Sequence, residues 1–348
     1  MKYLGNKTRL IDFIEMTLSK NKIKFSGINA LDLCAGTGAV SAFFKSNNCN
    51  VTSIDIMNYS VGELYRVLYY NNQPSFYELE DEVGGSDLDS VVSYLNNLKP
   101  IKGYYYNEYS DGGSAGRKYF SGFNGEKIDA IMLCLKKWEK LLQYEKYMFL
   151  RGIVVNSIDR ISNIAGTYGA YLKIWRSMAL KPLVINKPEF INNGSSIIIN
   201  GDIVNFLKNS NKYYDLIYLD PPYNNRQYAP NFHVLENLSN NDYPKLNGIT
   251  GIIDYQDKKS NFCYKSNALL ELENVVLYAK TNTFVLSYSN EGIMGEKDIV
   301  NILKKYFEKI VVERKIYRRF KTNSNTEAKT GLCELLFIAR DRLSSIGG

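Results

Sequence analysis

The sequence is poor in residues on which several kinds of protein site depend. Its single histidine, His233, excludes any mechanism built on two histidines. The 5 cysteines are scattered and odd in number, which argues against a disulfide framework and a zinc site, and we expect no metal. No apolar run approaches the ~20 residues that cross a bilayer, and the first residues lack the apolar stretch of a signal peptide. We therefore expect a cytoplasmic protein with no membrane contact.

The composition is that of a globular protein with a modest positive charge. The 348 residues suffice for one large domain or two ordinary ones. Lys and Arg outnumber Asp and Glu by 43 to 36, which is weak evidence for a polyanionic partner. Residues 301–321 are the most basic stretch, and we predict phosphate contacts for Arg318, Arg319 and Lys321 within it. A solvated helix face would explain the same charges if nothing else pointed to nucleic acid.

The first part of the chain predicts a strand–helix–strand unit with a glycine-rich turn. Residues 29–33 are typical of a buried strand, 34–38 of the turn, 39–45 of a helix, and 51–55 of a second strand that ends in an acid. Gly36 and Gly38 allow close approach of a ligand at the strand end. The third glycine of the dinucleotide fingerprint and the lysine of a P-loop are missing. Asp55 lies where an acid grips ribose hydroxyls, so the pattern favours an adenosine-type ligand over a plain tight turn.

The most specific signal is Asp220-Pro221-Pro222-Tyr223, which follows the predicted strand 214–219. A carboxylate there can accept a hydrogen bond from an exocyclic amine, and the Pro221 carbonyl can accept a second. The prolines carry no competing N–H, and a tyrosine ring can stack on a flipped base. This arrangement predicts a catalytic turn for methyl transfer to an aryl amine, in which positioning supplies most of the rate. A Pro-Pro turn alone would be only a turn.

Between these motifs the α/β pattern is interrupted. Residues 59–194 are mostly helical and loop-like, with an amphipathic helix expected over 128–149, whereas strands resume at 196–200, 283–288 and 334–339. We predict an α/β fold with a mostly parallel, Rossmann-like sheet and helices on both faces. Residues 1–58 and 195–348 form the catalytic domain, and 59–194 an inserted, mainly helical target-recognition domain.

These motifs together resemble the Dam-like class of adenine-specific DNA methyltransferases, and most closely the FokI-type modification methylases. The resemblance covers nearly the whole chain. It is carried by residues 3–7 (YLGNK), 32–38 (DLCAGTG), Asp55, Asp202 and 220–223 (DPPY), with 225–228, 231–236, 166–173 and 286–292 as finer matches. Residues 34–35 depart from the pattern, because many relatives carry an aromatic-containing pair there.

The resemblance implies an enzyme that uses S-adenosylmethionine to methylate adenine N6 in double-stranded DNA. It implies that Gly36 and Gly38 line the methionine part of the cofactor, that Asp55 holds the ribose, and that Asp202 meets the adenine. The cofactor-binding residues expected are Tyr3, Lys7, Asp32, Gly36, Gly38, Asp55, Asp202 and Asp220. The catalytic residues expected are Asp220, Pro221, Pro222 and Tyr223.

DNA contacts are predicted for Arg226, Gln227 and Lys173, together with the basic residues named above. Arg and Gln suit contacts to base edges, but Arg226 and Gln227 could equally tie down their loop. Arg117, Lys118, Arg160 and Arg176 are further candidates of this kind. His233 is interpreted as structural. The predicted partners are duplex DNA and, in a restriction–modification setting, a cognate endonuclease. An orphan or phage methylase is the alternative setting, and one active site per chain suggests a monomer on DNA.

Three other functions remain open on the sequence alone. The first is adenine methylation of structured RNA, although RNA enzymes of this fold usually append other modules. The second is another amine acceptor, cytosine N4 or a protein glutamine, whose enzymes commonly carry Ser or Asn at the position of Asp220. The third is a catalytically silent DNA-binding subunit of a methyltransferase complex. Such subunits usually lose the glycine-rich turn or the Asp-Pro-Pro-Tyr motif, and this chain keeps both.

Overall fold

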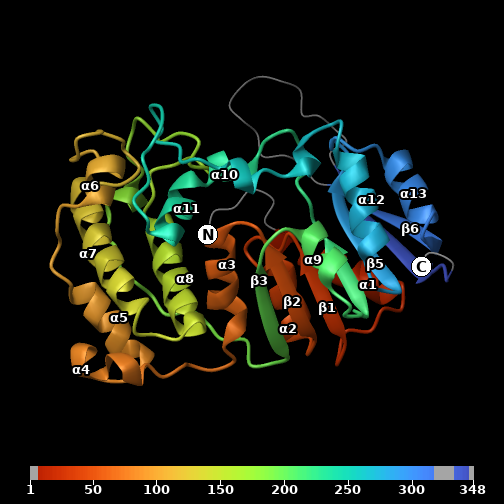
Figure 1. The fold of residues 1–348 in the computed structure, drawn as a ribbon, viewed down its shortest axis with the longest axis horizontal. Helices are drawn as coiled ribbons and strands as arrows, with labels where there is room; N and C mark the ends of the chain where they lie inside the picture. The colour runs from red at the N-terminus through yellow and green to blue at the C-terminus, as the bar shows by residue number, and fades with distance from the viewer. Residues whose placement is uncertain (1–6, 317–332, 345–348) are drawn as a thin grey trace.

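The computed structural model describes residues 7–316 and 333–344 and has a sheet on one side and a group of helices on the other (Figure 1). The described strands form one seven-stranded sheet in the order β3-β2-β1-β4-β5-β7-β6. Its first five strands run parallel, and β7 pairs antiparallel with both β5 and β6. The strands are β1 (Asn29–Leu33), β2 (Asn50–Asp55), β3 (Ser195–Asn200), β4 (Leu216–Leu219), β5 (Thr283–Ser289), β6 (Phe307–Ile316) and β7 (Cys333–Arg342).

Helices cover both faces of this sheet, which confirms the predicted fold class. Along β1, Ala30 packs toward α1 and α2, whereas Leu31 and Leu33 pack toward α9, α12 and α13. This alternation is the two-residue period of a strand buried on both faces. The helices are α1 (Ile11–Lys20) and α2 (Ala39–Ser46) on one face, and α9 (Ile203–Asn209), α12 (Ala268–Tyr278) and α13 (Glu296–Lys304) on the other. The short 3₁₀ helix η1 (Lys7–Leu10) precedes α1.

The chain between β2 and β3 forms a helical layer beside the β3 edge of the sheet (Figure 1). Its members pack around a core of their own, which includes Trp138, Phe149 and Tyr105. They are α3 (Asn58–Leu64), the π-helix η2 (Tyr65–Tyr69), α4 (Glu80–Val83), α5 (Leu88–Asn97), α6 (Tyr104–Tyr109), α7 (Gly122–Trp138) and α8 (Tyr144–Arg160). Two later helices, α10 (Tyr228–Asn231) and α11 (His233–Asn240), also contribute to this core. The helical layer therefore includes residues outside 59–194, and the boundaries of a separate domain stay a prediction.

Two local expectations differ from the structure. The helix expected over 128–149 is two helices, because α7 ends at Trp138 and α8 begins at Tyr144. Leu141 fits the apolar spacing of a helix but lies in the connection between α7 and α8 and is 49% exposed. The apolar spacing therefore continues across a break between two helices. The edge strand β6 was not predicted, since most of its side chains are not buried. Within the described residues no helix is both long and apolar enough to cross a membrane.

Candidate active site

The strand order brings the two sequence motifs to one point of the sheet edge. β1 pairs with β2 on one side and with β4 on the other, so the chain reverses its direction of winding at β1. Ligands of open α/β sheets bind at such a switch point, beyond the carboxyl ends of the strands. The glycine-rich turn follows β1, and the Asp-Pro-Pro-Tyr turn follows β4. The Asp220 N–H donates to the Leu33 carbonyl across this pair (3.4 Å).

The glycine-rich turn requires backbone angles that favour glycine. Gly36 has φ 55° and Gly38 has φ 74°, and Gly38 caps the start of α2. A Cβ on Gly38 would also lie 2.9 Å from Leu64 Cδ2 of α3. Cys34 adopts φ 60° without being a glycine, which is a strained conformation typical of functional turns. The turn lines a pocket that it shares with Lys7, Asp32 and Asp220.

Asp55, at the end of β2, holds this turn in place. Its Oδ2 accepts a hydrogen bond from the Gly36 N–H and its Oδ1 accepts one from the Met57 N–H, both at 2.8 Å. The residue is 6% exposed, and burial raises the pKa of its carboxyl even though these two hydrogen bonds act in the opposite direction. Asp55 is thus a fixed acid in the wall of the main cavity.

The main cavity continues from Asp55 along the ends of β2, β3 and β4. Asp202, which caps α9 by accepting a hydrogen bond from the Asn205 N–H (2.8 Å), lies in its wall. Cys34 and Asp220 line both this cavity and the pocket at the glycine-rich turn, so the two adjoin. The structure therefore brings together six of the eight expected cofactor residues at these pockets: Lys7, Asp32, Gly36, Asp55, Asp202 and Asp220. Gly38 caps the helix behind the turn, and Tyr3 lies outside the described residues.

Asp32 lies beneath the glycine-rich turn and is 1% exposed. Its carboxylate accepts a hydrogen bond from Ser41 Oγ, which also lies 2.8 Å from Ser53 Oγ. Burial raises the pKa of Asp32 to about 7, against the hydrogen bond from Ser41. Asp32 thus ties α2 to β1 and β2 from within the sheet.

Asp220 forms a buried charge cluster with Lys7 and Glu334. Lys7 Nζ lies 2.9 Å from Asp220 Oδ1 and 2.8 Å from Glu334 Oε1. Burial raises the pKa of Asp220 to about 6, against the effect of the Lys7 charge and with that of Glu334. Burial alone would lower the pKa of Lys7, but the two carboxylates outweigh it and hold that pKa well above its usual value. Asp220 is therefore a carboxylate above pH about 6, paired to a permanently charged lysine.

Tyr223 is supported by the end of β5 and by the segment that follows it. Its ring meets Tyr288 edge-on, with centroids 6.3 Å apart and planes at 85°. Its carbonyl accepts a hydrogen bond from the Ile293 N–H at 2.9 Å. Lys7 Nζ lies 5.9 Å from the centroid of the same ring. These contacts explain why residues 286–292, quoted in the resemblance, lie close to the Asp-Pro-Pro-Tyr turn.

Several residues at the site escaped sequence reasoning. Glu334 is the second residue of β7 and lies on the same face of the strand as Leu336 and Ile338, which belong to the core. A charged residue at a core-facing position of a buried strand is the signal that could have identified it. The segment from Lys258 to Phe262 also lines the main cavity, together with Glu271. No periodicity marks that segment, and only its fold-back over β2, where Lys258 Nζ donates to the Ile56 carbonyl (2.8 Å), brings it there.

The residues proposed to contact DNA have different surroundings. Arg226 and Lys173 are exposed. Gln227 exchanges two hydrogen bonds with the backbone of Ser260, at 3.1 and 2.8 Å, and so ties the loop down. Arg318, Arg319 and Lys321 lie outside the described residues. Within the same basic stretch, Lys309 pairs with Asp341 (2.7 Å) and Arg314 pairs with Glu296.

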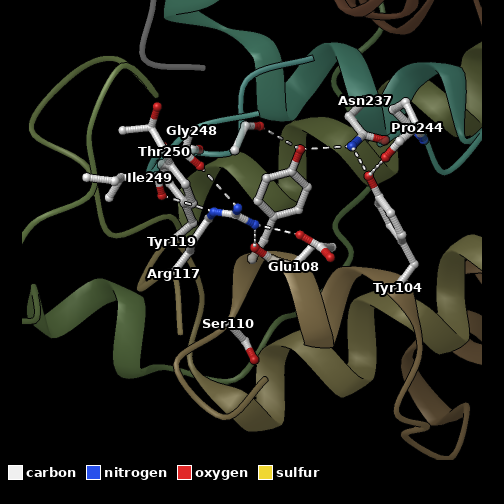
Figure 2. Close-up of polar contacts among 12 residues, drawn as sticks. Tyr104, Glu108, Ser110, Arg117, Tyr119, Asn237, Pro244, Gly248, Ile249 and Thr250 are labelled. Atoms are coloured by element: carbon white, nitrogen blue, oxygen red, sulfur yellow. Dashed lines mark hydrogen bonds and ion pairs between the residues drawn. The ribbon is translucent and has the colours of Figure 1, made fainter. Parts of the chain in front are cut away.

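Arg117 holds a loop of the helical layer (Figure 2). Its guanidinium donates to the carbonyls of Ile249 (3.0 Å) and Gly248 (3.3 Å) and forms an ion pair with Glu108. Tyr119 adds a hydrogen bond to the Thr250 carbonyl at 3.0 Å. Ile249 itself is 83% exposed, so the loop keeps a fixed backbone while presenting an apolar tip.

His233 and Glu236 join α11 to other parts of the helical layer. The His233 ring is fully buried, with Nε2 3.0 Å from the Tyr168 carbonyl oxygen, and burial lowers the pKa of His233 to about 4. The Glu236 carboxylate accepts hydrogen bonds from the N–H groups of Asn58 and Tyr59, at 3.0 and 3.1 Å. It thereby caps α3, the first helix after β2. Both residues join elements rather than face the cavities.

The structure is thus an α/β sheet with a glycine-rich turn and an Asp-Pro-Pro-Tyr turn beside the pockets at its switch point. The chain belongs to the D12 class of N6 adenine-specific DNA methyltransferases, which it matches over residues 3–302. This confirms the resemblance stated from the sequence.

Its relatives are modification methylases. The chain is 34% identical over 344 residues to modification methylase StsI of Streptococcus sanguinis, covering 97% of this chain and 51% of that protein. It is 32% identical to type II methyltransferase M.FokI of Planomicrobium okeanokoites, covering 98% and 53%. It is also 32% identical to type II methyltransferase M.NlaIII of Neisseria lactamica, covering 93% of each. The chain thus spans about half the length of the first two relatives and nearly all of the third.

Proposed function

We propose that this chain transfers a methyl group from S-adenosylmethionine to the N6 amine of adenine in double-stranded DNA. The observation that carries the proposal is the position of Asp220. It lies between a pocket bounded by the glycine-rich turn and a cavity that holds two further acids, Asp55 and Asp202. Membership of the family and the names of its relatives support the choice of adenine in DNA.

The residues at the cavities fit the proposed cofactor. Asp55 offers a buried carboxylate suited to ribose hydroxyls, and Asp202 an acid suited to an exocyclic amine. Ile56, Ile203 and Phe262 supply apolar wall for a purine ring. S-adenosylmethionine, when bound, supplies an activated methyl group on a positively charged sulfur. Gly36 would approach the amino-acid part of the cofactor through the pocket that it shares with Lys7.

The Asp-Pro-Pro-Tyr turn would orient the acceptor. The Asp220 carboxylate would accept one hydrogen of the target amine, and the Pro221 carbonyl would accept the other. Both hydrogen bonds direct the nitrogen lone pair toward the methyl donor, which raises the rate through orientation. Tyr223, held by Tyr288 and Ile293, would stack on the flipped base. Hydrogen bonding to a carboxylate also favours the loss of the amine proton that accompanies methylation.

The helical layer would recognise the DNA. We propose residues 59–194 as an inserted target-recognition domain, because most of this segment packs around its own core. The exposed Arg226 and Lys173 are suited to phosphate or base-edge contacts. We further propose that the enzyme acts as a cytoplasmic monomer beside a restriction endonuclease. Phosphate contacts predict that binding weakens steeply with added salt.

Methyl transfer from labelled S-adenosylmethionine to unmethylated DNA, followed by nucleoside analysis, tests the proposed function. Asp220→Asn removes the charged acceptor, and we expect it to abolish about 99% or more of the transfer, as loss of one preorganised transition-state contact commonly does. Asp215→Asn is the matched control. Asp215 lies at the opposite end of β4, where its Oδ2 accepts a hydrogen bond from the Asn29 N–H (2.8 Å), far from the chemistry.

The product identifies the acceptor. N6-methyladenine that is formed by the wild type and by Asp215→Asn, but not by Asp220→Asn, supports the proposal. Methyl groups on RNA, on cytosine or on protein would overturn the proposed acceptor. Cofactor binding by calorimetry without any transfer would instead favour a silent DNA-binding subunit.

A further inference from the structure

One buried lysine at the active site is shared by two carboxylates. Lys7 Nζ contacts Asp220, which the proposed reaction requires, and Glu334, which it does not use directly. The side chains of Lys7 and Glu334 are only 6% and 4% exposed. A lysine and one carboxylate would already cancel in charge. A second buried carboxylate leaves the cluster with a net negative charge, which burial disfavours unless the group has a role.

Glu334 is a charged residue on a face of β7 that also carries apolar core residues. Leu336 and Ile338, which share its face of β7, belong to the apolar core beneath α1 and α2. On the neighbouring strand β5, Val285 belongs to the same core, and Ser287, two residues on, donates to Glu334 Oε1. The sheet thus presents one carboxylate and one hydroxyl to the point where Lys7 enters from η1. Glu334 Oε1 accepts from both of these donors.

We propose that Glu334 is a positioning residue of the methyl-transfer site. With Ser287 it holds the Lys7 ammonium beside Oδ1 of Asp220, and it takes part of the lysine's charge onto itself. The inference rests on the proposed function, because it assigns Glu334 a role in orienting Asp220 for the target amine. Lys7 contacts Asp220 at Oδ1, so Oδ2 would be the oxygen that accepts from the target amine.

Sharing the ammonium preserves Asp220 as a hydrogen-bond acceptor. An ammonium that faced Asp220 alone would draw more negative charge from the carboxylate and weaken its bond to the amine. The other titratable groups that act on Asp220 or respond to it are Asp32 on β1, Cys34 in the glycine-rich turn, Tyr218 on β4 and Tyr228 on α10. Among these groups and Glu334, it is Glu334 that both acts on Asp220 and forms an ion pair with Lys7.

The test compares two substitutions of Glu334 in the full chain. Glu334→Gln keeps an oxygen that can accept from Lys7 and Ser287 but removes the charge. Glu334→Asp keeps the charge but shortens the side chain by one methylene, which moves the carboxylate away from Lys7. Glu313→Gln on β6 is the control, since it breaks the ion pair with Lys20 (2.6 Å) on the surface. Methyl transfer is measured for each from pH 5 to 9, with kcat and KM separated.

We expect Glu334→Gln to move the acid limb of kcat/KM to lower pH by roughly one pH unit, because a neighbouring negative charge is lost. We also expect kcat on the plateau to fall about tenfold, with the KM for S-adenosylmethionine unchanged within about twofold. Glu334→Asp should keep the acid limb in place but lower kcat, and Glu313→Gln should match the wild type. An acid limb that Glu334→Gln leaves in place overturns the inference and leaves the proposed function intact.

A second measurement does not depend on activity. Urea unfolding of Glu334→Gln, Asp220→Asn and the double variant at pH 7 forms a double-mutant cycle. Each single variant leaves Lys7 one carboxylate, whereas the double variant leaves its charge buried and unpaired. We expect the double variant to lose more stability than the sum of the single losses. Additive losses would show that the two acids do not share the lysine, even if the wild type transferred no methyl group and the proposed function had failed.

Discussion

At the scale of single residues, the Tyr223 ring depends on a glycine that does not touch it. A Cβ on Gly292 would lie 2.2 Å from Tyr288 Cε1, so only glycine allows the Tyr288 ring its place. That ring supports Tyr223 edge-on, and its hydroxyl accepts a hydrogen bond from the Met294 N–H at 3.2 Å. A side chain at position 292 must therefore displace Tyr288, and with it the surface on which the target base would stack.

We predict that Gly292→Ala lowers kcat by about tenfold to a hundredfold, since a misplacement of about 1 Å can have that effect. Cofactor affinity, measured by calorimetry, should stay near that of the wild type, because Gly292 does not line the cavities. Gly166→Ala, where a Cβ meets no atom within 4 Å, is the control. Full activity of Gly292→Ala would mean that the Tyr288 contact does not orient Tyr223.

Residues whose position follows directly from the end of a predicted strand could be identified from the sequence. Asp55 and Asp220 each end a predicted strand, and parallel strands end at one edge, so their approach could be expected. Glu334 and Ser287 could not be identified in that way. Their role comes from a lysine 327 residues from Glu334, and only the strand order places η1 over β7. Gln227 was left open between base contact and loop support because its partner, Ser260, lies in a segment without a pattern.

At the scale of elements, one close helix crossing lies within the helical layer, at the first helix after β2. α3 and α8 meet through Gly62 and Gly152, and a Cβ on Gly152 would lie 2.0 Å from the Gly62 carbonyl oxygen. The atom in the way is backbone, so one helix would have to move. Because α3 leaves directly from β2 and also packs against α11, its displacement would reach the end of β2 at Asp55.

We predict that Gly152→Ala destabilises the protein by about 1–3 kcal/mol, the usual range for overpacking. The better helix propensity of alanine, about 1 kcal/mol, opposes this but does not cancel a backbone clash. The midpoint of urea unfolding measures the effect. Gly122→Ala in α7 is the matched control, since its Cβ would meet neighbours only at 3.7 Å or more. Equal midpoints for the two variants would contradict the prediction.

The buried central strands were predicted well, whereas the break between α7 and α8 and the exposed edge strand β6 were not. β1, β2, β4 and β5 are almost wholly buried, and each was expected within two residues of its observed bounds. The break between α7 and α8 was missed because apolar residues continue through the connection. β6 escaped because half of the residues in this edge strand are charged, and its basic residues were interpreted as part of a phosphate-binding patch. Lys309 and Arg314 on that strand are instead paired with acids.

At the scale of the whole molecule, buried carboxylates give stability a dependence on pH. Burial raises the pKa of Asp32 to about 7, and of Asp220 and Glu236 to about 6. In the unfolded chain these groups titrate near 4, so between pH 4 and 7 the folded state binds more protons than the unfolded state. Each group therefore lowers stability as pH rises through that window. The lowered pKa of His233, about 4, acts in the opposite direction between pH 4 and 6.5.

We predict that Asp32→Asn removes one contribution to the decrease of stability with rising pH. The free energy of unfolding of the wild type, relative to that of Asp32→Asn, should decrease from pH 5 to pH 8 and be level above it. Urea unfolding at these values in the absence of cofactor measures the difference. If the difference were the same at pH 5 and pH 8, Asp32 would not carry a raised pKa in the folded protein.

The position of β7 has a consequence for the order in which the fold forms during synthesis. β7 lies between β5 and β6 in the sheet and follows both in the chain. While the protein is being synthesised, β6 has no strand to pair with, and Lys7 has no Glu334, until residues 333–342 have left the ribosome. A nascent chain can thus form its glycine-rich turn and its Asp-Pro-Pro-Tyr turn early, and still lack the charge cluster. Chains cut short before β7, by premature termination or proteolysis, would lack both Glu334 and the strand with which β6 pairs.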